Sequence, residues 1–192
     1  AIIEIGGTVG DIEGLPFIEA IRQLRIDLGR EYTLFIHLTL VPYIKTAGEV
    51  KTKPTQHSVK ALSEIGIQPH MLLCRTAKSL EEPIRKKIGL FCSMSSRHVI
   101  EAIDASTIYE VPQNLEQQGF TDLVMERLQI DAPPADMTDW EEFVSRIKNP
   151  ANRIKIAICG KYVHLKYAYK SSIEAFIHAG ADGPTQNYRR EL

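Results

Sequence analysis

The sequence predicts an α/β protein built on a mostly parallel sheet that helices cover on both faces. Segments typical of strands and of helices alternate along residues 1–130, as they do in parallel α/β folds. The strand segments are short, almost continuously apolar runs, which are typical of strands buried on both faces. The pattern is interrupted at residues 131–152 and resumes afterwards. We therefore expect an α/β domain at 1–130, a linker at 131–152 and the start of a second α/β domain at 153–192.

The strands are expected where β-branched and large apolar residues gather in short runs. These runs are residues 1–5, 33–41, 71–74, 99–103 and 153–159. The first of them begins with the first residue of the sequence. We therefore expect that the sequence starts inside a larger domain.

The helices are expected where apolar residues recur with helical spacing between start and stop signals. Phe17, Ile21, Leu24 and Leu28 form one such face, which Gly29 ends. Pro54 and Gly66 bracket the next helix, and acidic residues open the helix at 81–91. The remaining predicted helices are 111–118, 138–148 within the linker, and 168–178.

The composition narrows the class of protein. The net charge of −1 lacks the basic excess of a dedicated nucleic-acid binder. No apolar run approaches the ~18 residues that indicate a membrane span. Cys74, Cys92 and Cys159 show no metal-binding spacing, so we expect buried free thiols. These observations predict a cytoplasmic protein without nucleic-acid or membrane partners.

The basic stretch that includes Lys51 and Lys53 is the first candidate site. Two lysines one residue apart project to the same side of an extended chain, and Pro54 then opens a helix. A helix N-terminus beside ammonium groups suits a polyphosphate. The alternative is a solvated basic loop. Lys87 lies in a basic run at 85–87 that also suits a solvated helix face.

The glycine-rich loop at 6–10 is the second candidate. Glu4 lies at the carboxyl end of the first expected strand, where an unpaired carboxylate is costly to bury. It therefore either binds a metal ion or forms a salt bridge with a nearby lysine. Asp11 and Glu13 can cap the helix that follows. Ligands of parallel sheets collect at the carboxyl ends of strands, so both candidate sites can share one crevice. No catalytic triad is recognisable.

Two long motifs resemble the CTP synthase family. They are IEIGGTVGDIE at 3–13 and GEVKTKPTQHS at 48–58, and shorter matches follow in order at 65–69, 90–92 and 108–112. The turn at 160–162 resembles the start of that family's glutaminase domain. The resemblance covers roughly residues 1–180.

The resemblance implies a Rossmann-like, P-loop-type amidoligase (synthetase) domain, truncated at its N-terminus, followed by the beginning of a class I glutamine amidotransferase domain. The family uses ATP and Mg²⁺ to phosphorylate UTP at O4. Ammonia released from glutamine then displaces the phosphate to give CTP, which inhibits the enzyme by feedback. The UTP pocket of this family is assembled between the subunits of a homotetramer.

The resemblance also implies roles for individual residues. Glu4 corresponds to a Mg²⁺ ligand. The UTP and CTP phosphate site corresponds to Lys51, Thr52, Lys53, Pro54, Thr55, Gln56 and Lys87. The segment that recognises CTP as inhibitor corresponds to Asp11, Ile12 and Glu13, and the segment near the ATP adenine to Ile103, Asp104 and Ala105.

The sequence also departs from the family pattern. It holds no GxxxxGK phosphate loop, and the glutaminase nucleophile has no counterpart among its cysteines. We therefore expect no catalytic residue within this chain and no CTP formation by the chain alone. Two alternatives remain: a related P-loop amidoligase, such as a dethiobiotin or cobyrinic acid synthetase, and a module that binds CTP without catalysis.

Overall fold

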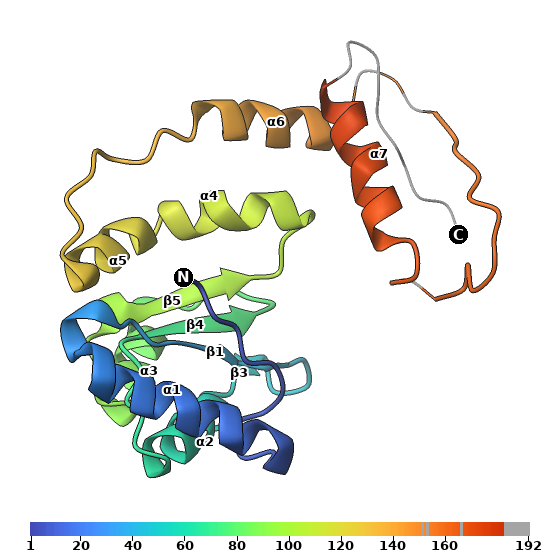
Figure 1. Ribbon diagram of the computed structural model, residues 1–192. Coiled ribbons are helices and arrows are strands. Elements are labelled where there is room, and N and C mark those ends of the chain that lie inside the picture. The colour runs from blue at the N-terminus through green and yellow to red at the C-terminus, as the bar shows by residue number, and fades with distance from the viewer. Residues whose placement is uncertain (151, 153, 166, 183–192) are drawn as a thin grey trace. The chain divides into compact units, whose positions relative to one another are not determined.

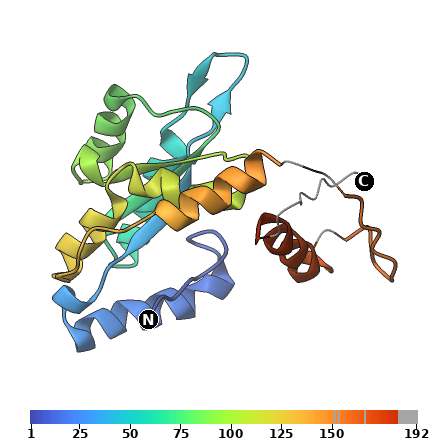
Figure 2. The ribbon, with the colours of Figure 1, turned by 90° about the horizontal axis from the view of Figure 1, so that it is seen from above.

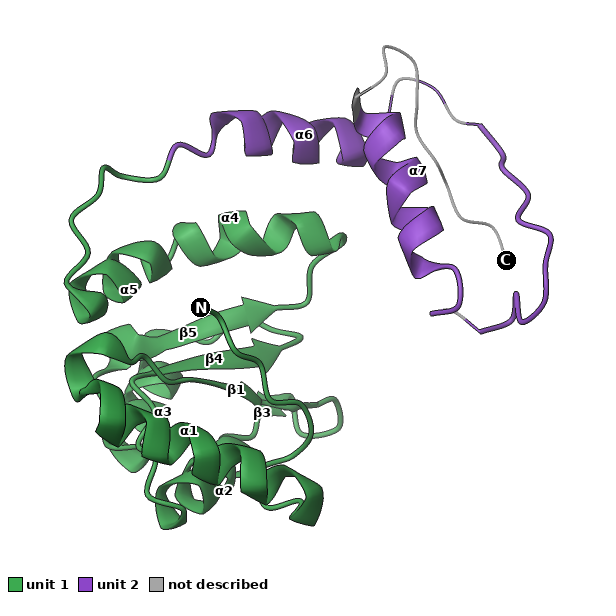
Figure 3. Cartoon of the chain, viewed as in Figure 1, with its two compact units in different colours: residues 1–135 green, residues 136–192 purple. Residues whose placement is uncertain are grey.

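The computed structural model describes the chain except residues 151, 153, 166 and 183–192. The chain divides into two compact units, residues 1–135 and 136–192 (Figure 3). Each unit is described by itself below.

A parallel three-stranded sheet forms the centre of the first unit (Figure 1). Its strands are β1 (Ile36–Leu40), β4 (Met71–Thr76) and β5 (Val99–Ile103), in the order β1-β4-β5. Leu38 pairs with Leu73, and Leu73 pairs with Ile100. The predicted α/β fold with a parallel sheet is confirmed. The central strand β4 is almost entirely buried, as its apolar sequence predicts.

Helices cover both faces of the sheet. The helices are α1 (Leu15–Leu28), α2 (Lys53–Glu64), α3 (Glu82–Phe91), α4 (Val111–Glu116) and α5 (Phe120–Leu128). Leu72 and Cys74 of β4 lie in one apolar cluster with residues of α2 and α3. Met71 and Ile100 belong to a second cluster that α4 and α5 complete on the opposite face. α1 packs on α2 through Ile18. The sequence analysis missed α5, which follows Gly119 directly.

The predicted strand at residues 1–5 is wrong. This segment has no regular secondary structure, and the side chains of Ile2 and Ile3 are exposed. In the part of the chain that the structure describes, β1 pairs with β4 alone, so no neighbouring strand binds the backbone of 1–5. The segment instead packs through Ile5 against the cluster between α1 and α2, as does Val9 of the glycine loop that follows.

Two apolar surfaces are also less buried than predicted. In the apolar face predicted for α1, Phe17 is 63% exposed and Leu28 is 51% exposed. Ile18, which is not part of that predicted face, is buried instead. The side chains of Leu38 and Leu40 on β1 are exposed as well. α4 contacts β5, which is at the opposite edge of the sheet from β1. One face of β1 therefore lacks a helical cover.

Short elements complete the first unit. The hairpin strands are β2 (Tyr43–Ile44) and β3 (Glu49–Val50), and the 3-10 turns are η1 (Ile12–Gly14), η2 (Arg30–Tyr32), η3 (Ser96–His98) and η4 (Ile108–Glu110). Thr107 and Glu110 form a reciprocal capping box at the start of η4. This box fixes the direction in which the chain leaves β5 and enters α4.

The second unit contains helices α6 (Thr138–Lys148) and α7 (Lys170–Asp182), so both predicted helices are confirmed. They pack through Val144 and Ala181, which are 3% and 1% exposed, and through the rings of Phe143 and His178. The predicted strand at 153–159 is wrong over the described residues 154–159, where Ile154 alone forms an isolated bridge. A lone strand without a sheet cannot satisfy its backbone groups. Residue 153 and the polar segment 183–192 lie outside the described residues.

The cysteines divide into two kinds. Cys74 and Cys92 are buried in the sheet-side core, and burial raises the pKa of each thiol to about 11. Both thiols are therefore protonated and unreactive at neutral pH. Cys159 is exposed, so the prediction that all three thiols are buried is wrong for this residue, which is the last residue of the predicted strand that did not form.

Candidate functional site

The carboxyl ends of β1, β4 and β5 meet at one edge of the sheet, where ligands of parallel sheets bind. The chain leaves β1 through Val41, whose N–H donates to the carbonyl of Arg75, and then forms the β2–β3 hairpin. In Figure 2 this hairpin, drawn in cyan, projects away from the sheet. It leads directly into the basic stretch.

The hairpin was not predicted, although its sequence carries a recognisable signal. Tyr43 pairs with Val50, and Ile44 pairs with Glu49. Gly48 in the connecting loop has φ +66°, a conformation that glycine adopts without strain. A four-residue loop with a glycine before the second strand is typical of hairpins. The N–H of Lys51 donates to the carbonyl of Pro42 at 2.9 Å, which holds the basic stretch against the start of the hairpin.

Lys51 and Lys87 both lie near Glu49. The ammonium group of Lys51 forms an ion pair with Glu49, and both side chains are about half exposed. The hydrogen bond from Lys51, its charge and the more distant charge of Lys87 lower the pKa of Glu49. Exposed pairs of this kind are weak, so a ligand that carries several negative charges can displace the single carboxylate. The structure therefore brings α3 and the basic stretch to one place.

Lys53 is exposed at the first position of α2, while Thr52 beside it is 5% exposed. Thr52 has φ −88° and ψ −15°, which are helical angles. The prediction of extended chain through the two lysines is therefore wrong at this residue. The physical reason is that the carbonyl of Thr52 already accepts a helical hydrogen bond from the N–H of Gln56 at 3.2 Å.

Thr55 is completely buried. Its hydroxyl lies 3.1 Å from both the hydroxyl of Thr39 and the carbonyl of Leu40, so it joins α2 to β1. Gln56 donates to the hydroxyl of Thr52 at 3.0 Å. In this structure the two threonines and the glutamine hold the turn into α2. The lysines are the exposed groups of the stretch.

Replacing Thr55 by valine is expected to destabilise the chain by about 1–3 kcal/mol, because the carbonyl of Leu40 and the hydroxyl of Thr39 lose a buried partner. Urea denaturation measures the change. Thr138→Val is the control, since the hydroxyl of Thr138 bonds only to an exposed carboxylate, that of Asp136. A Thr55→Val protein with unchanged stability would contradict the structural role assigned to this hydroxyl.

Asp11 closes the glycine loop. Its carboxylate accepts a hydrogen bond from the N–H of Thr8 at 3.0 Å, and its own N–H donates to the carbonyl of Thr8. The following helix α1 has Gly14 at its N-cap position and no capping bond from a side chain, and η1 has none from Asp11. The capping alternative is therefore not met. Ile12 is 84% exposed, and Glu13 is exposed too.

Glu4 is exposed in the irregular segment 1–5. The desolvation cost on which its assignment rested therefore does not apply in this chain. Among the residues that the structure describes, Glu4 forms no salt bridge. It also belongs to no group of three or more metal-binding side chains among them. The salt-bridge alternative is thus not met, and the metal assignment stays a prediction.

The glycine loop and the hairpin do not lie side by side. They overlap in the view of Figure 1 but are separated in Figure 2. A single chain therefore does not form the shared crevice that the sequence analysis expected. The reason is that Val9 packs with α1 and α2, whereas the hairpin continues from β1.

Further charged groups gather after the other two strands. Asp104 follows Ile103, the last residue of β5, and its carboxylate lies 3.3 Å from Nε of Arg75. Lys78 follows β4, and its ammonium group lies 5.8 Å from the centre of the Tyr43 ring. Sequence reasoning missed Lys78, although its place two residues after a strand was a usable signal. Ala105 is half-buried beside Asp104.

No helix in the described part of the chain is long and apolar enough to cross a bilayer.

A parallel sheet with exposed cations after the carboxyl ends of its strands defines a parallel α/β protein of the ligand-binding type. Comparison with known proteins specifies the family. Residues 1–130 match the family described as CTP synthase N-terminus, and the chain belongs to this family.

Three curated relatives illustrate the similarity, and each carries the name CTP synthase. The relative from Desulfotalea psychrophila is 59% identical over 186 residues, which are 97% of this chain and 34% of the relative. The relative from Methanocaldococcus jannaschii is 56% identical over 185 residues, 96% of this chain and 34% of the relative. The relative from Desulfitobacterium hafniense is 55% identical over 181 residues, which are 94% of this chain and 34% of the relative. The chain spans about a third of the length of these relatives.

Proposed function

We propose that this chain is the nucleotide-recognising part of a CTP synthase, an enzyme that aminates UTP to CTP with ATP and with ammonia from glutamine. Phosphorylation of UTP at O4 precedes the displacement by ammonia in this proposal. The observation that carries it is the arrangement of Lys51, Lys53 and Lys87 around the start of α2. Lys51 and Lys87 both act on Glu49, and Lys53 is exposed at the N-terminus of the helix.

The proposed site holds the triphosphate of UTP by charge. Ammonium groups are strong point charges for phosphate, and the N-terminal turn of a helix favours anions. Thr52, Pro54, Thr55 and Gln56 shape the turn that presents the lysines. CTP has the same triphosphate as UTP and therefore binds the same lysines, while Asp11, Ile12 and Glu13 recognise CTP as inhibitor. The exposed side chain of Ile12 is free to contact a ligand or a neighbouring subunit.

Glu4 fits a role as Mg²⁺ ligand. Mg²⁺ in nucleotide sites is commonly held by one or two carboxylates while phosphates and water supply the other ligands. A single exposed carboxylate next to a glycine loop meets this requirement. The ion, when bound with ATP, neutralises charge on the phosphates. Ile103, Asp104 and Ala105 at the end of β5 are proposed to lie near the adenine of ATP.

A homotetramer is part of the proposal. The glycine loop and the lysines lie apart within one chain, so a pocket that needs both requires a second subunit. The exposed apolar side chains of α1, Phe17 and Leu28, support contacts between subunits.

Residues 1–130 are assigned to the synthetase domain, 131–152 to a linker, and 153–192 to the beginning of the glutaminase domain. A cytoplasmic location is proposed with them.

Nucleotide competition tests the proposal. We expect calorimetry on the chain with Mg²⁺ to show at most weak binding of UTP and CTP, and that each displaces the other, because they share the triphosphate site. A dethiobiotin or cobyrinic acid synthetase would bind its own carboxylic acid substrate and leave UTP unbound. Failure of UTP and CTP to compete would refute the shared site.

Turnover separates the enzyme from a module that only binds CTP. The 192 residues hold no GxxxxGK loop, so the chain alone, given UTP, ATP, Mg²⁺ and ammonium, is expected to produce no CTP. The complete open reading frame that contains this sequence is expected to produce it. Nucleotide binding without turnover by that longer protein would favour the binding module.

A further inference from the structure

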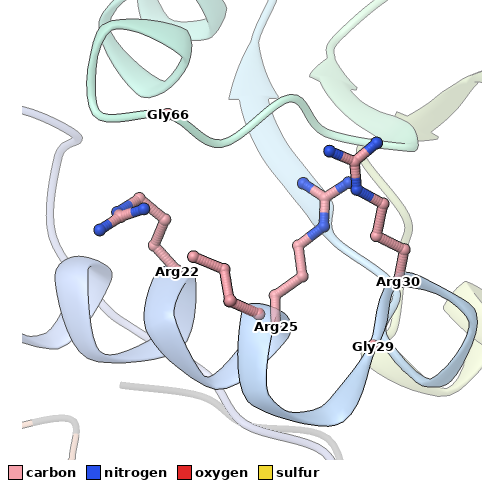
Figure 4. Close-up of a pocket in the computed structure, with 6 residues that line it drawn as sticks. Arg22, Arg25, Gly29, Arg30 and Gly66 are labelled. Atoms are coloured by element: carbon pink, nitrogen blue, oxygen red, sulfur yellow. The ribbon is translucent and has the colours of Figure 1, made fainter.

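A second basic site lies at the opposite edge of the sheet, where the strands begin. A pocket of about 360 Å³ opens beside the end of α1 (Figure 4). Its lining residues are Arg22, Arg25, Ile26, Gly29, Arg30 and Gly66. The volume is within the range of small-molecule sites. The proposed nucleotide function makes no use of this pocket.

Two arginines that line this pocket, Arg25 and Arg30, lie near a third, Arg127, which is outside the lining. Figure 4 shows that the side chains of Arg25 and Arg30 bring their guanidinium groups close to each other. Arg127 approaches from α5 and donates to the carbonyl of Arg30. Within the described residues none of these three arginines forms an ion pair. Arg22 differs, because it is held by Glu19 through two bonds of 2.7 Å.

Arg25 carries an unmet hydrogen-bond donor. Its Nε is buried and has no hydrogen-bond partner in the described part of the chain, while its guanidinium carbon lies 5.4 Å from the centre of the Phe35 ring. Burial, followed by the charges of Arg30 and Arg127, lowers the pKa of Arg25. A buried donor without an acceptor is costly, and a nearby anion would remove this cost. Glu31 lies at the edge of the pocket, beside Gly29, but it is exposed and forms no ion pair with the cluster.

His70 adds a second unmet donor. The N–H of Phe35 donates to Nδ1 of His70 at 2.9 Å, so the proton of the neutral ring is on Nε2. Nε2 in turn lies 3.0 Å from Nη2 of Arg127, which is also a donor. Two donors face each other here, and neither supplies the acceptor that the other needs. Burial and the charges of Arg127 and Arg25 lower the pKa of His70 to about 4, so the ring is neutral at pH 7.

We propose that Arg25, Arg30, Arg127 and His70 bind a phosphoryl group. Phosphate oxygens accept several hydrogen bonds and match the fork of donors on arginine. One such group gives Nε of Arg25 an acceptor and can accept from both Arg127 and Nε2 of His70. The ligand is either free phosphate or a small phosphorylated molecule, since the pocket has room for more than one phosphoryl group.

The test is phosphate binding by the chain at constant ionic strength, with inorganic phosphate, pyrophosphate and UTP as separate probes. Saturable binding of phosphate or pyrophosphate is expected to weaken about tenfold or more in Arg30→Gln, which loses a charged donor. The double variant Arg25→Gln/Arg30→Gln is expected to abolish it. Arg30 is exposed, so the single variant remains informative if the double variant does not fold. Pyrophosphate that binds more tightly than phosphate indicates a phosphorylated molecule as ligand.

Two control variants separate this site from general charge and from the nucleotide site. Arg97→Gln removes an arginine that is paired with Glu126 elsewhere on the surface, and Lys51→Gln changes the proposed UTP site. Arg97→Gln is expected to bind phosphate as the parent does. In Lys51→Gln, the response of His70 to phosphate is expected to persist, because this response reports on the arginine cluster alone. NMR titration is expected to show that phosphate raises the pKa of His70, because a nearby anion favours the charged ring. Equal losses in Arg30→Gln and Arg97→Gln, or a His70 pKa that ignores phosphate, would overturn the proposal, whatever UTP does.

Discussion

Replacing both Lys51 and Lys53 by glutamine is expected to weaken UTP and CTP binding about 100-fold or more. Each lysine supplies a charge-assisted contact to phosphate, worth about 1.5–3 kcal/mol, and 1.4 kcal/mol is a tenfold change in affinity. Glutamine is a polar, uncharged side chain of similar reach. Because the lysines are exposed, the fold is expected to be unaffected.

Calorimetry measures the affinity, and Lys60→Gln supplies the control. Lys60 is also exposed on α2 and lies 3.8 Å from Glu64, away from the helix start. Its replacement is expected to leave nucleotide affinity within about twofold of the parent. The affinity of the parent should fall as salt is added, since exposed charges are screened, and this fall should be smaller in the double variant. Equal losses in Lys60→Gln and the double variant would show that net charge, rather than this site, attracts the nucleotide.

The sequence predicts well where a local signal and burial agree. β5 is found at the predicted bounds because residues 99–103 are apolar except for Glu101. α2 (Lys53–Glu64) begins one residue before Pro54 and ends two residues before Gly66, within a residue or two of its start and stop signals. Residues 1–5 carry an equally strong apolar signal, but a strand also needs a neighbour with which to pair. Composition alone does not tell whether that neighbour is present in the same chain.

The same limit applies to the candidate site. The lysine pair is recognisable from residue types, and the ion pair of Lys51 with Glu49 follows from their spacing in the hairpin. The position of Lys87 near Glu49 depends on how α3 packs, which no short pattern contains. The arginine cluster is equally hidden, because Arg25, His70 and Arg127 are far apart in the sequence and converge only at the amino ends of the strands.

The two proposed sites divide the sheet between them. The lysines follow the carboxyl end of β1, whereas Phe35 and His70 immediately precede the first residues of β1 and β4. Their chemistry differs too. The lysines are exposed point charges beside a helix start, whereas Arg25 and Arg127 are partly buried forks of donors next to the exposed Arg30. The first site therefore suits a flexible triphosphate, and the second suits a phosphoryl group held in a fixed orientation.

Replacing Gly89 by alanine is expected to destabilise the chain by about 2–3 kcal/mol, although the same change inside an exposed helix stabilises by up to about 1 kcal/mol. Gly89 is buried in α3. A Cβ atom there would lie 2.7 Å from the carbonyl oxygen of Met94 and 3.3 Å from the backbone nitrogen of Ser96. Both atoms belong to the chain that returns toward β5, so main chain rather than a flexible side chain would have to move.

Urea denaturation of Gly89→Ala, compared with Gly14→Ala, measures this effect. Gly14 has no atom within 4 Å of the added Cβ and has φ −81°, so alanine there is expected to be neutral or slightly stabilising. The two variants add the same methyl group, and the difference between them isolates the contact with the returning chain. A Gly89→Ala protein at least as stable as the parent would mean that α3 and the loop before β5 are not as close as 2.7 Å requires, and that β5 is positioned by α4 and α5 alone.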